Sequence, residues 1–307
     1  YKSVLYILIC TLIFHICGLW ITVIYLDWEI YGVGLVTCLS FTLNFIIISI
    51  YVNHKKVILT SDKWFFTDAE AFRKIPEFLK YGTSTSFMLV LEWLGYDLMT
   101  ILAGWIGSSE QAASVIMFQV WFFLFMNSLG ITYSATSLVG NSLGANKPNT
   151  AKRYAQAALI FGYFETVILA IVYYFLREPV IHAFTTDGEV INCIMGSFYL
   201  YIIAMSLDCG QGLSGGIIRA MGYQNLATIV QFISIWSILL PIAYFLGFTQ
   251  GLGFHGIWIA APIGAGCLNC GYLSLVLLAP WEKLAGTASQ ENKLNEKLPS
   301  EEDFHLE

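Results

Sequence analysis

The chain of 307 residues alternates long apolar blocks with short polar segments. A hydrocarbon layer about 30 Å thick is crossed by about 20 apolar residues in a helix. Eight blocks reach this length, and they lack the alternation that is typical of barrel strands. The sequence therefore predicts an all-α polytopic membrane protein with about eight transmembrane helices. The blocks are about Val4 to Leu26, Val33 to Val52, Phe78 to Ile106, Ala112 to Leu138, Ala151 to Leu176, Val190 to Ile218, Leu226 to Phe248 and Gly256 to Leu278.

Basic residues favour one orientation of these helices. If both ends of the chain are cytoplasmic, all of the 15 lysines and arginines except Arg177 fall in cytoplasmic segments or at their borders. Cytoplasmic loops of membrane proteins carry such an excess of basic residues, so we expect this orientation. No lysine or arginine is expected deep within a span.

The polar segments divide the chain into four parts. Residues 1–52 hold two spans, and residues 53–77 form a charged cytoplasmic connector. Residues 78–281 hold six closely connected spans, which we expect to form one bundle. Residues 282–307 carry seven acids and three lysines, and we expect them to form a disordered cytoplasmic tail. Since the chain begins with Tyr1 instead of Met, we also expect a truncated start.

The composition gives little indication of any function outside the membrane. The chain is 57% hydrophobic and 12% charged, with a net charge of −6, most of which lies in the tail. We expect no nucleic-acid partner. The seven cysteines lie almost entirely within or beside spans, where cysteine is mostly a small apolar residue. Cys267 and Cys270 have a CxxC spacing but no histidine nearby, so we expect no bound metal and no cofactor.

Four acids within the predicted spans are the strongest functional signal. An acid at membrane depth costs roughly 3 kcal/mol on insertion scales, so it usually faces a cavity, an ion path or a partner. Each of these acids must therefore be protonated, paired or hydrated. The pattern predicts a transporter that handles protons or other cations. The four are Glu92, Asp97, Glu165 and Asp208.

The third span places aromatic residues beside its two acids. Glu92 and Asp97 are about 140° apart around an ideal helix, so they share a face only if the helix bends, for which Gly95 is suitably placed. Tyr96 shares a face with Glu92, and Trp93 shares a face with Asp97. Aromatic faces beside carboxylates suit a large organic cation. The alternative is that these rings serve only in packing.

Other polar residues within spans have a simpler explanation. We expect them to be hydrogen-bonded contacts between helices, although His15 is also placed to join a proton path. The glycines near the end of the fourth span, with Asn141, predict a structural turn or a close helix approach, and a gating role is left open. Gly212 and Gly216 predict a face for close packing. The contact residues are His15, Asn44, Gln119, Asn127 and Asn269, and the turn residues are Gly140, Asn141 and Gly144.

Six short stretches occur in a recognisable order along the chain. LEWLGYD resembles the pattern E-W-W-x-Y-E, VGNSLGA resembles V-G-N-x-L-G-A, LDCGQG resembles L-D-G-L-Q-G, and RAMGYQ resembles R-G-x-G-x-Q. These are patterns of eukaryotic members of the multidrug and toxic compound extrusion (MATE) family. The stretches are Leu91–Asp97, Val139–Ala145, Phe184–Asp187, Leu207–Gly212, Arg219–Gln224 and Gly256–Trp258.

The resemblance implies a fold of twelve spans in two lobes of six. On that register residues 1–52 are the last two helices of the N-lobe, residues 78–281 are a complete C-lobe, and the first four helices are missing. The family implies export of organic cations or other amphipathic compounds, driven by protons or sodium through alternating access between the lobes. It also implies a multi-pass protein of the plasma membrane or of a vacuolar or vesicular membrane.

The resemblance also implies roles for individual residues. Ion-coupling roles fall on Glu92, Asp97 and Asp208, while Trp93 and Tyr96 match the aromatic lining of the cavity. Gln119 and Gln211 are the further substrate-binding candidates. Asp97 is shorter than the usual glutamate, and Gln119 stands where animal members often have an acid; Phe118 replaces a frequent tyrosine there, and Glu165 matches no family acid.

Two other functions are weighed against antiport. A flippase for lipid-linked oligosaccharides usually needs basic residues within its cavity, and none is expected at depth. A membrane-embedded transferase needs a histidine or an aspartate-rich site, whereas His54, His182 and His255 are isolated in the sequence.

Overall fold

The computed structural model describes residues 2–55 and 75–297, so most of the predicted connector and the last ten residues lie outside the described residues. By its contacts the chain divides into two units, Tyr1–Lys80 and Tyr81–Glu307. In the described part of the chain, eight helical segments are long and apolar enough to cross a membrane, which confirms the predicted fold class and number of spans.

The first unit is built around a helical hairpin. Hydrogen bonds between polar side chains join its two arms: His15 Nδ1 lies 3.0 Å from Ser40 Oγ, and Tyr51 donates to Ser3 Oγ over 2.8 Å. His15 is thus in a helix contact, one of its two predicted roles. The arms are α1 (Lys2–Leu19), which continues as the π-helical segment η1 (Trp20–Tyr25), and α2 (Glu29–Lys55).

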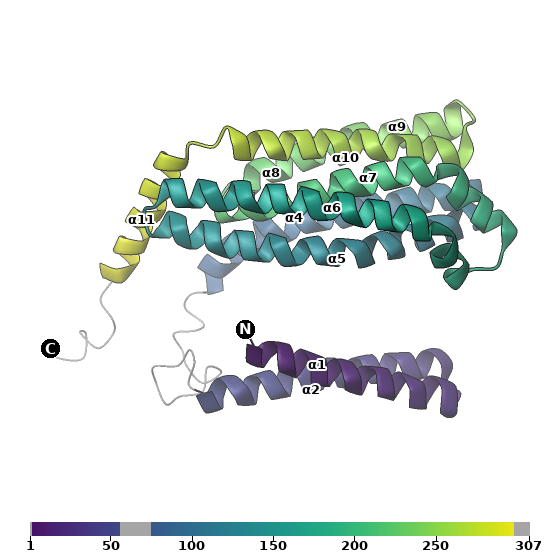
Figure 1. The fold of residues 1–307 in the computed structure, drawn as a ribbon, viewed down its shortest axis with the longest axis horizontal. Helices are drawn as coiled ribbons and strands as arrows, with labels where there is room; N and C mark the ends of the chain where they lie inside the picture. Colours follow the sequence, from purple (N-terminus) through teal and green to yellow (C-terminus); the bar gives the residue numbers. More distant parts are fainter. Residues whose placement is uncertain (1, 56–74, 298–307) are drawn as a thin grey trace. The chain divides into compact units, whose positions relative to one another are not determined.

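The second unit is a bundle of long helices that run side by side (Figure 1). Helix α7 packs against α5, α6 and α10, and α10 packs in turn against the span that precedes it. That span is interrupted by two π-helical segments. The elements are α4 (Ile75–Ile106), whose first residues belong to the first unit, α5 (Ser108–Gly144), α6 (Pro148–Phe184), α7 (Gly188–Ala220), α8 (Gln224–Gln231), η3 (Phe232–Leu239), α9 (Leu240–Tyr244), η4 (Phe245–Thr249) and α10 (Gly253–Leu277).

Local sequence explains where these helices begin and end. Pro148 occupies the first turn of α6, where a missing N–H costs nothing. Asp187 caps α7, because its Oδ1 accepts a hydrogen bond from Glu189 N over 2.8 Å. Gly222, with φ at +76°, follows α7 in the left-handed region that favours glycine.

The predicted turn after the fourth span lies further along the chain than expected. Gly140, Asn141 and Gly144 are all helical residues of α5. The reversal follows them, and its left-handed residue is Asn146, with φ at +56°. Asparagine tolerates this conformation better than other non-glycine residues, so the turn needs no glycine. Gly140 instead faces Ala220 of α7 at van der Waals distance.

The predicted small-residue face of α7 lies at a close helix contact. A side chain at Gly216 would overlap Thr132 of α5, and Thr136 of α5 donates to the Gly216 carbonyl over 2.9 Å. A side chain at Gly212 would lie 2.8 Å from the ring of Phe125. These glycines therefore let α5 and α7 approach closely, which is the packing role predicted for them.

The second unit has two apolar cores with a polar level between them. Along α7, Met205 belongs to one core and Leu213 to the other, with Asp208 and Gln211 between. Helices α4, α5 and α6 also contribute residues to both cores, on either side of this level. We call this level the polar layer; its side chains are those of Glu92, Ser128, Glu165, Thr166, Asp208 and Gln211.

The prediction of a disordered tail from residue 282 is wrong for its first part. Residues Trp281–Lys297 form helix α11, which packs on α5 and α6. Trp281, Leu284, Ala285 and Ala288 recur at helical spacing and join one of the apolar cores, with Ala285 fully buried. The high charge of the segment obscured this apolar stripe. Residues 298–307 lie outside the described residues.

Candidate functional site

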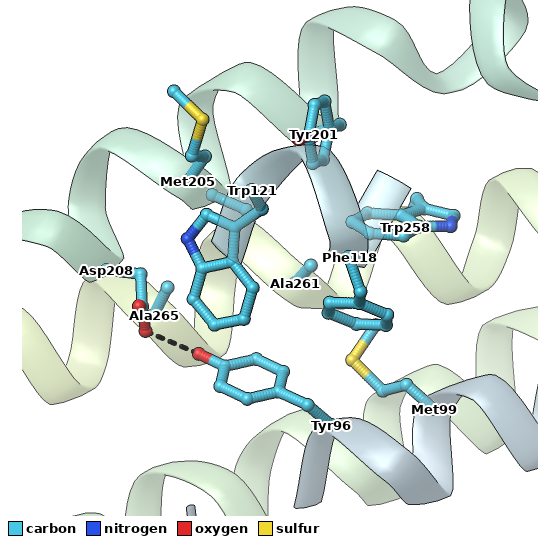
Figure 2. A pocket seen from close by; sticks show the side chains of 11 residues that line it. Tyr96, Met99, Phe118, Trp121, Tyr201, Met205, Asp208, Trp258, Ala261 and Ala265 are labelled. Atoms are coloured by element: carbon cyan, nitrogen blue, oxygen red, sulfur yellow. Dashed lines mark hydrogen bonds between the residues drawn. The ribbon is translucent and has the colours of Figure 1, made fainter. Parts of the chain in front are cut away.

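Two predicted acids meet through a glutamine in the polar layer. Tyr96 of α4 donates to Asp208 Oδ1 over 2.6 Å, a short bond typical of a donor to a carboxylate (Figure 2). Gln211, one turn along α7, donates from Nε2 to Glu92 Oε1 over 2.7 Å and lies 3.3 Å from Asp208 Oδ1. Glu92, Tyr96, Asp208 and Gln211 thus form one hydrogen-bonded network between α4 and α7.

The second oxygen of Asp208 differs from the first. Asp208 is 2% exposed, and its Oδ2 is a buried atom without a hydrogen-bond partner in the described part of the protein. A buried carboxylate oxygen without a partner is costly. A proton or a bound cation at Oδ2 would remove that cost. The network therefore contains an acceptor position suited to an ion.

Sequence reasoning missed the residues behind Glu92. Gln231, at the end of α8, donates from Nε2 to Glu92 Oε2 over 3.3 Å and to the Met88 carbonyl over 3.1 Å. Its Oε1 accepts a hydrogen bond from Tyr272 of α10 over 3.0 Å. The signal for Gln231 was the one amide side chain within its apolar block. Its partners lie far away in sequence, so the contact itself was not visible there.

A cavity of about 220 Å³ opens beside Glu92. Trp93, Phe125 and Tyr133 contribute to its wall, and Gln211 contributes polar atoms. Arg219 also lines it from the last turn of α7, at the end of the span and not deep within it. It reaches the cavity because α7 extends past its apolar block.

Asp97 and Gln119 line a different cavity, of about 310 Å³. Both side chains are exposed, and neither belongs to the hydrogen-bonded network around Asp208. The separation follows from the helix, because Glu92 and Asp97 point in different directions on the continuous α4. Gly95 lies in a close contact with Ile235 of η3 instead of marking a break in the helix.

Aromatic side chains separate and border these spaces. Trp93, Tyr96, Trp121 and Phe122 line both larger cavities. A third space of only about 20 Å³ lies between Asp208 and a cluster of rings that includes Tyr96, Phe118, Tyr201 and Trp258 (Figure 2). That volume is about enough for one water molecule, so these rings form a packed wall and not a ligand pocket.

Two asparagines that were predicted to join helices have different kinds of partner. Tyr163 donates to Asn269 Oδ1 over 2.8 Å and joins α6 to α10, as expected for a helix contact. Asn127 Nδ2 donates to the Leu124 carbonyl of its own helix over 3.3 Å, so this bond does not join two helices. The described residues include no group of three or more histidine, cysteine or acidic side chains placed to hold a metal ion.

The chain resembles known proteins over most of its length. The MatE family model matches residues 85–245, which is more than half of the chain. Protein DETOXIFICATION 51 of Arabidopsis thaliana is 26% identical over 282 residues, covering 90% of this chain and 52% of that protein. Multidrug and toxin extrusion protein 1 of Oryctolagus cuniculus is 26% identical over 247 residues, covering 80% of this chain and 43% of that protein.

A solved structure has the same fold. The crystal structure of the eukaryotic MATE transporter AtDTX14 superposes with a TM-score of 0.86 at 20% identity, covering 92% of this chain and 63% of that chain. The chain therefore spans about half of the length of the curated relatives that it matches, and somewhat more of the solved structure.

Proposed function

Because this chain belongs to the MatE family and is a multi-pass integral membrane protein and not an enzyme, we propose that it acts in secondary active antiport. The cargo is an organic cation or a related xenobiotic. Protons or sodium ions move in the opposite direction and supply the free energy. The coupling acids are Glu92 and Asp208.

The buried, unpartnered Oδ2 of Asp208 is the observation that carries this proposal. A carboxyl at membrane depth is stable when it holds a proton or a cation, and it becomes costly when that ion leaves. Gln211 bridges Asp208 to Glu92, which lines a cavity large enough for part of an organic molecule. The charge on this pair is thereby linked to the occupant of the cavity.

The aromatic walls favour an organic cation as cargo. Trp93 and Phe122 contact each other edge to face at 5.4 Å between ring centroids, next to both larger cavities. Aromatic faces attract cations, and the carboxylates of Glu92 and Asp97 add the complementary charge. We assign Gln119 and Gln211 as polar groups that orient the cargo.

The assignment of lobes follows the same reasoning. We infer that residues 1–52 are the last two helices of an N-lobe, that residues 53–77 connect the lobes, and that residues 78–281 are the C-lobe. The contact boundary at residue 80 supports the division between the last two parts. Alternating access then requires movement of one lobe relative to the other.

A lipid-linked oligosaccharide flippase is the second candidate, because Arg219 lines the same cavity as Glu92. An arginine is a strong ligand for phosphate groups. Here, however, it shares its cavity with an acid, which disfavours an anionic cargo. Scrambling of a fluorescent polyprenyl pyrophosphate sugar, without any effect of an ion gradient, would favour the flippase over the antiporter.

The test of the proposal is transport driven by an imposed gradient. Vesicles containing the full-length protein should accumulate a radiolabelled tetraalkylammonium cation when a proton or sodium gradient is directed outward from the vesicle, and uptake should stop when an ionophore removes that gradient. Comparing the two gradients identifies the ion. Uptake that equals that of empty vesicles under both gradients contradicts the proposal.

Gln231 is expected to position Glu92. Gln231→Leu removes its hydrogen bond to Glu92 Oε2, and a hydrogen bond to a charged group contributes about 1.5–3 kcal/mol. We therefore expect gradient-driven uptake at least about tenfold slower, measured at equal amounts of inserted protein. Tyr272→Phe is the matched control, because it leaves both donor contacts of Gln231 in place; a loss as large in that variant would assign the effect to packing.

A further inference from the structure

Glu165 lies outside the network described above, at the middle of the outer helix α6. It is the eighteenth of the 37 residues of that helix, about 25 Å from its first residue at 1.5 Å per residue. The large apolar side chains around it on the same helix, Phe161, Phe164 and Ile168, are exposed by 61%, 63% and 44%. Exposed apolar side chains of this size suit contact with hydrocarbon, and Glu165 lies among them at the middle of a helix long enough to cross a membrane.

The three cavities described above are lined by residues of α4, α5, α7 and α10, and α6 contributes to none of them. Glu165 therefore has no direct access to the space in which the cargo is proposed to bind. Its carboxyl belongs to a different surface of the bundle. Any ion that it binds does not come from these cavities.

Three buried polar side chains from three helices lie beneath Glu165. We call Ser128, Thr166 and Cys209 the polar floor. Ser128 of α5 donates to Glu165 Oε2 over 3.4 Å. Cys209 of α7 lies beside Ser128 and beside Thr166 of α6. Ser128, Thr166 and Cys209 are each buried to at least 98%. An accidental acid on a lipid-facing helix would lie over apolar side chains, whereas this carboxyl lies over buried hydroxyl and thiol groups.

The floor provides no positive charge. The group that donates to Glu165 from α5 is a hydroxyl, and the titratable side chain of α7 near it is the Cys209 thiol, which lies behind that hydroxyl. Hydroxyl and thiol groups both donate and accept hydrogen bonds, so they suit a neutral carboxyl, which also does both. An ionised carboxylate there would need a cation that the described residues do not supply.

We propose that Glu165 is a second proton-binding site, open to the lipid side of α6 and separate from the Glu92–Asp208 network. The two sites lie at the same level of the bundle, since Cys209 directly follows Asp208 and is turned by about 100° around α7. A proton is the ligand that the neutral floor, the membrane depth and the lack of a neighbouring cation favour together. The inference does not depend on which cargo the protein carries.

An apolar carbodiimide tests this proposal directly. A protonated carboxyl adds across a C=N bond of dicyclohexylcarbodiimide, its proton moves to nitrogen, and the O-acylisourea rearranges to an N-acylurea without loss of atoms. Protein in liposomes should gain one such adduct, which peptide mass spectrometry should locate at Glu165. Above the pH at which Glu165 is half protonated, the rate of its modification should fall about tenfold per pH unit, because the protonated fraction falls by the same factor.

Four controls make the result specific. Glu178→Gln alters an exposed acid about 20 Å further along the same helix and should leave labelling unchanged. Glu165→Gln should remove the adduct, and the combined change of Glu92→Gln with Asp208→Asn should preserve it. A water-soluble carbodiimide should modify Glu165 at least about tenfold more slowly than the apolar reagent, because it enters hydrocarbon poorly.

Other results would overturn the proposal. An unmodified Glu165 in wild-type protein at every pH would mean that the carboxyl is ionised and holds another cation, or is covered. A rate independent of pH would mean that the group does not exchange its proton. Loss of the adduct in the combined Glu92 and Asp208 variant would make the two sites one. The wild-type measurement stands alone if Glu165→Gln fails to fold.

Discussion

Asp208→Asn is expected to reduce gradient-driven uptake of an organic cation to the level of empty vesicles. The amide oxygen still accepts the hydrogen bond from Tyr96, so the local geometry is retained. The amide does not bind a proton, and it is a much weaker ligand for a cation than a carboxylate. The effect is measured as uptake of the labelled cation driven by the imposed proton or sodium gradient, at equal amounts of inserted protein.

An assay of cation exchange without a gradient distinguishes loss of ion coupling from loss of cation binding. Asp208→Asn should still exchange labelled for unlabelled cation across the membrane without a gradient, because that process needs no change in the charge of Asp208. Glu178→Gln, which changes an exposed acid at the end of α6, should behave like wild type in both assays. Normal uptake by Asp208→Asn would place coupling elsewhere, and loss of both activities would point to misfolding.

Gly256→Ala is expected to lower stability more than any other glycine-to-alanine change at the ends of α10. A methyl group at Gly256 would lie 2.7 Å from both the carbonyl carbon and the oxygen of Leu246, and 2.9 Å from Gly247 N. These are backbone atoms of η4, so the strain cannot be relieved by a rotamer change. Overpacking of this kind costs about 1–3 kcal/mol. Thermal unfolding in detergent should begin several degrees lower.

Gly266→Ala is the matched control on the same helix. Its added methyl group would meet only Leu207 Cδ1, at an ordinary contact distance of 3.7 Å. Alanine also favours the helix more than glycine does. Its melting temperature should equal or exceed that of wild type. Equal melting temperatures for Gly256→Ala and Gly266→Ala would show that η4 moves away from α10 freely.

The spans and their acids were predictable because each depends on a few neighbouring residues. A block such as Val190 to Ile218 is apolar along its whole length, and an acid such as Asp208 stands out against it. Helix ends were less accurate: α5 and α6 extend several residues beyond their apolar blocks. Polar residues at the ends of a long helix continue its backbone without any apolar signal.

The details of the site depended on contacts between distant parts of the chain. Gln231 reaches Glu92 from 139 residues further along, and Tyr272 reaches Gln231 from α10. Local patterns contain no information about such pairs. The missing partner of Asp208 Oδ2 is likewise a property of the packed bundle. Helix α11 is a different case, since its apolar stripe was present in the sequence but was outweighed by the charge around it.

The π-helical turn of η3 makes the packing of the seventh span against α4 depend on the number of residues between two of its side chains. Gln231 Nε2 donates to the Met88 carbonyl and Trp236 Nε1 donates to the Leu91 carbonyl, so two side chains five residues apart both reach α4. In an α-helix, residues five apart point about 140° away from each other, whereas the i→i+5 turn brings them toward one side. Insertions and deletions are thus constrained here more tightly than substitutions, so relatives of this chain should keep the spacing of the two donors even where the residues between them change.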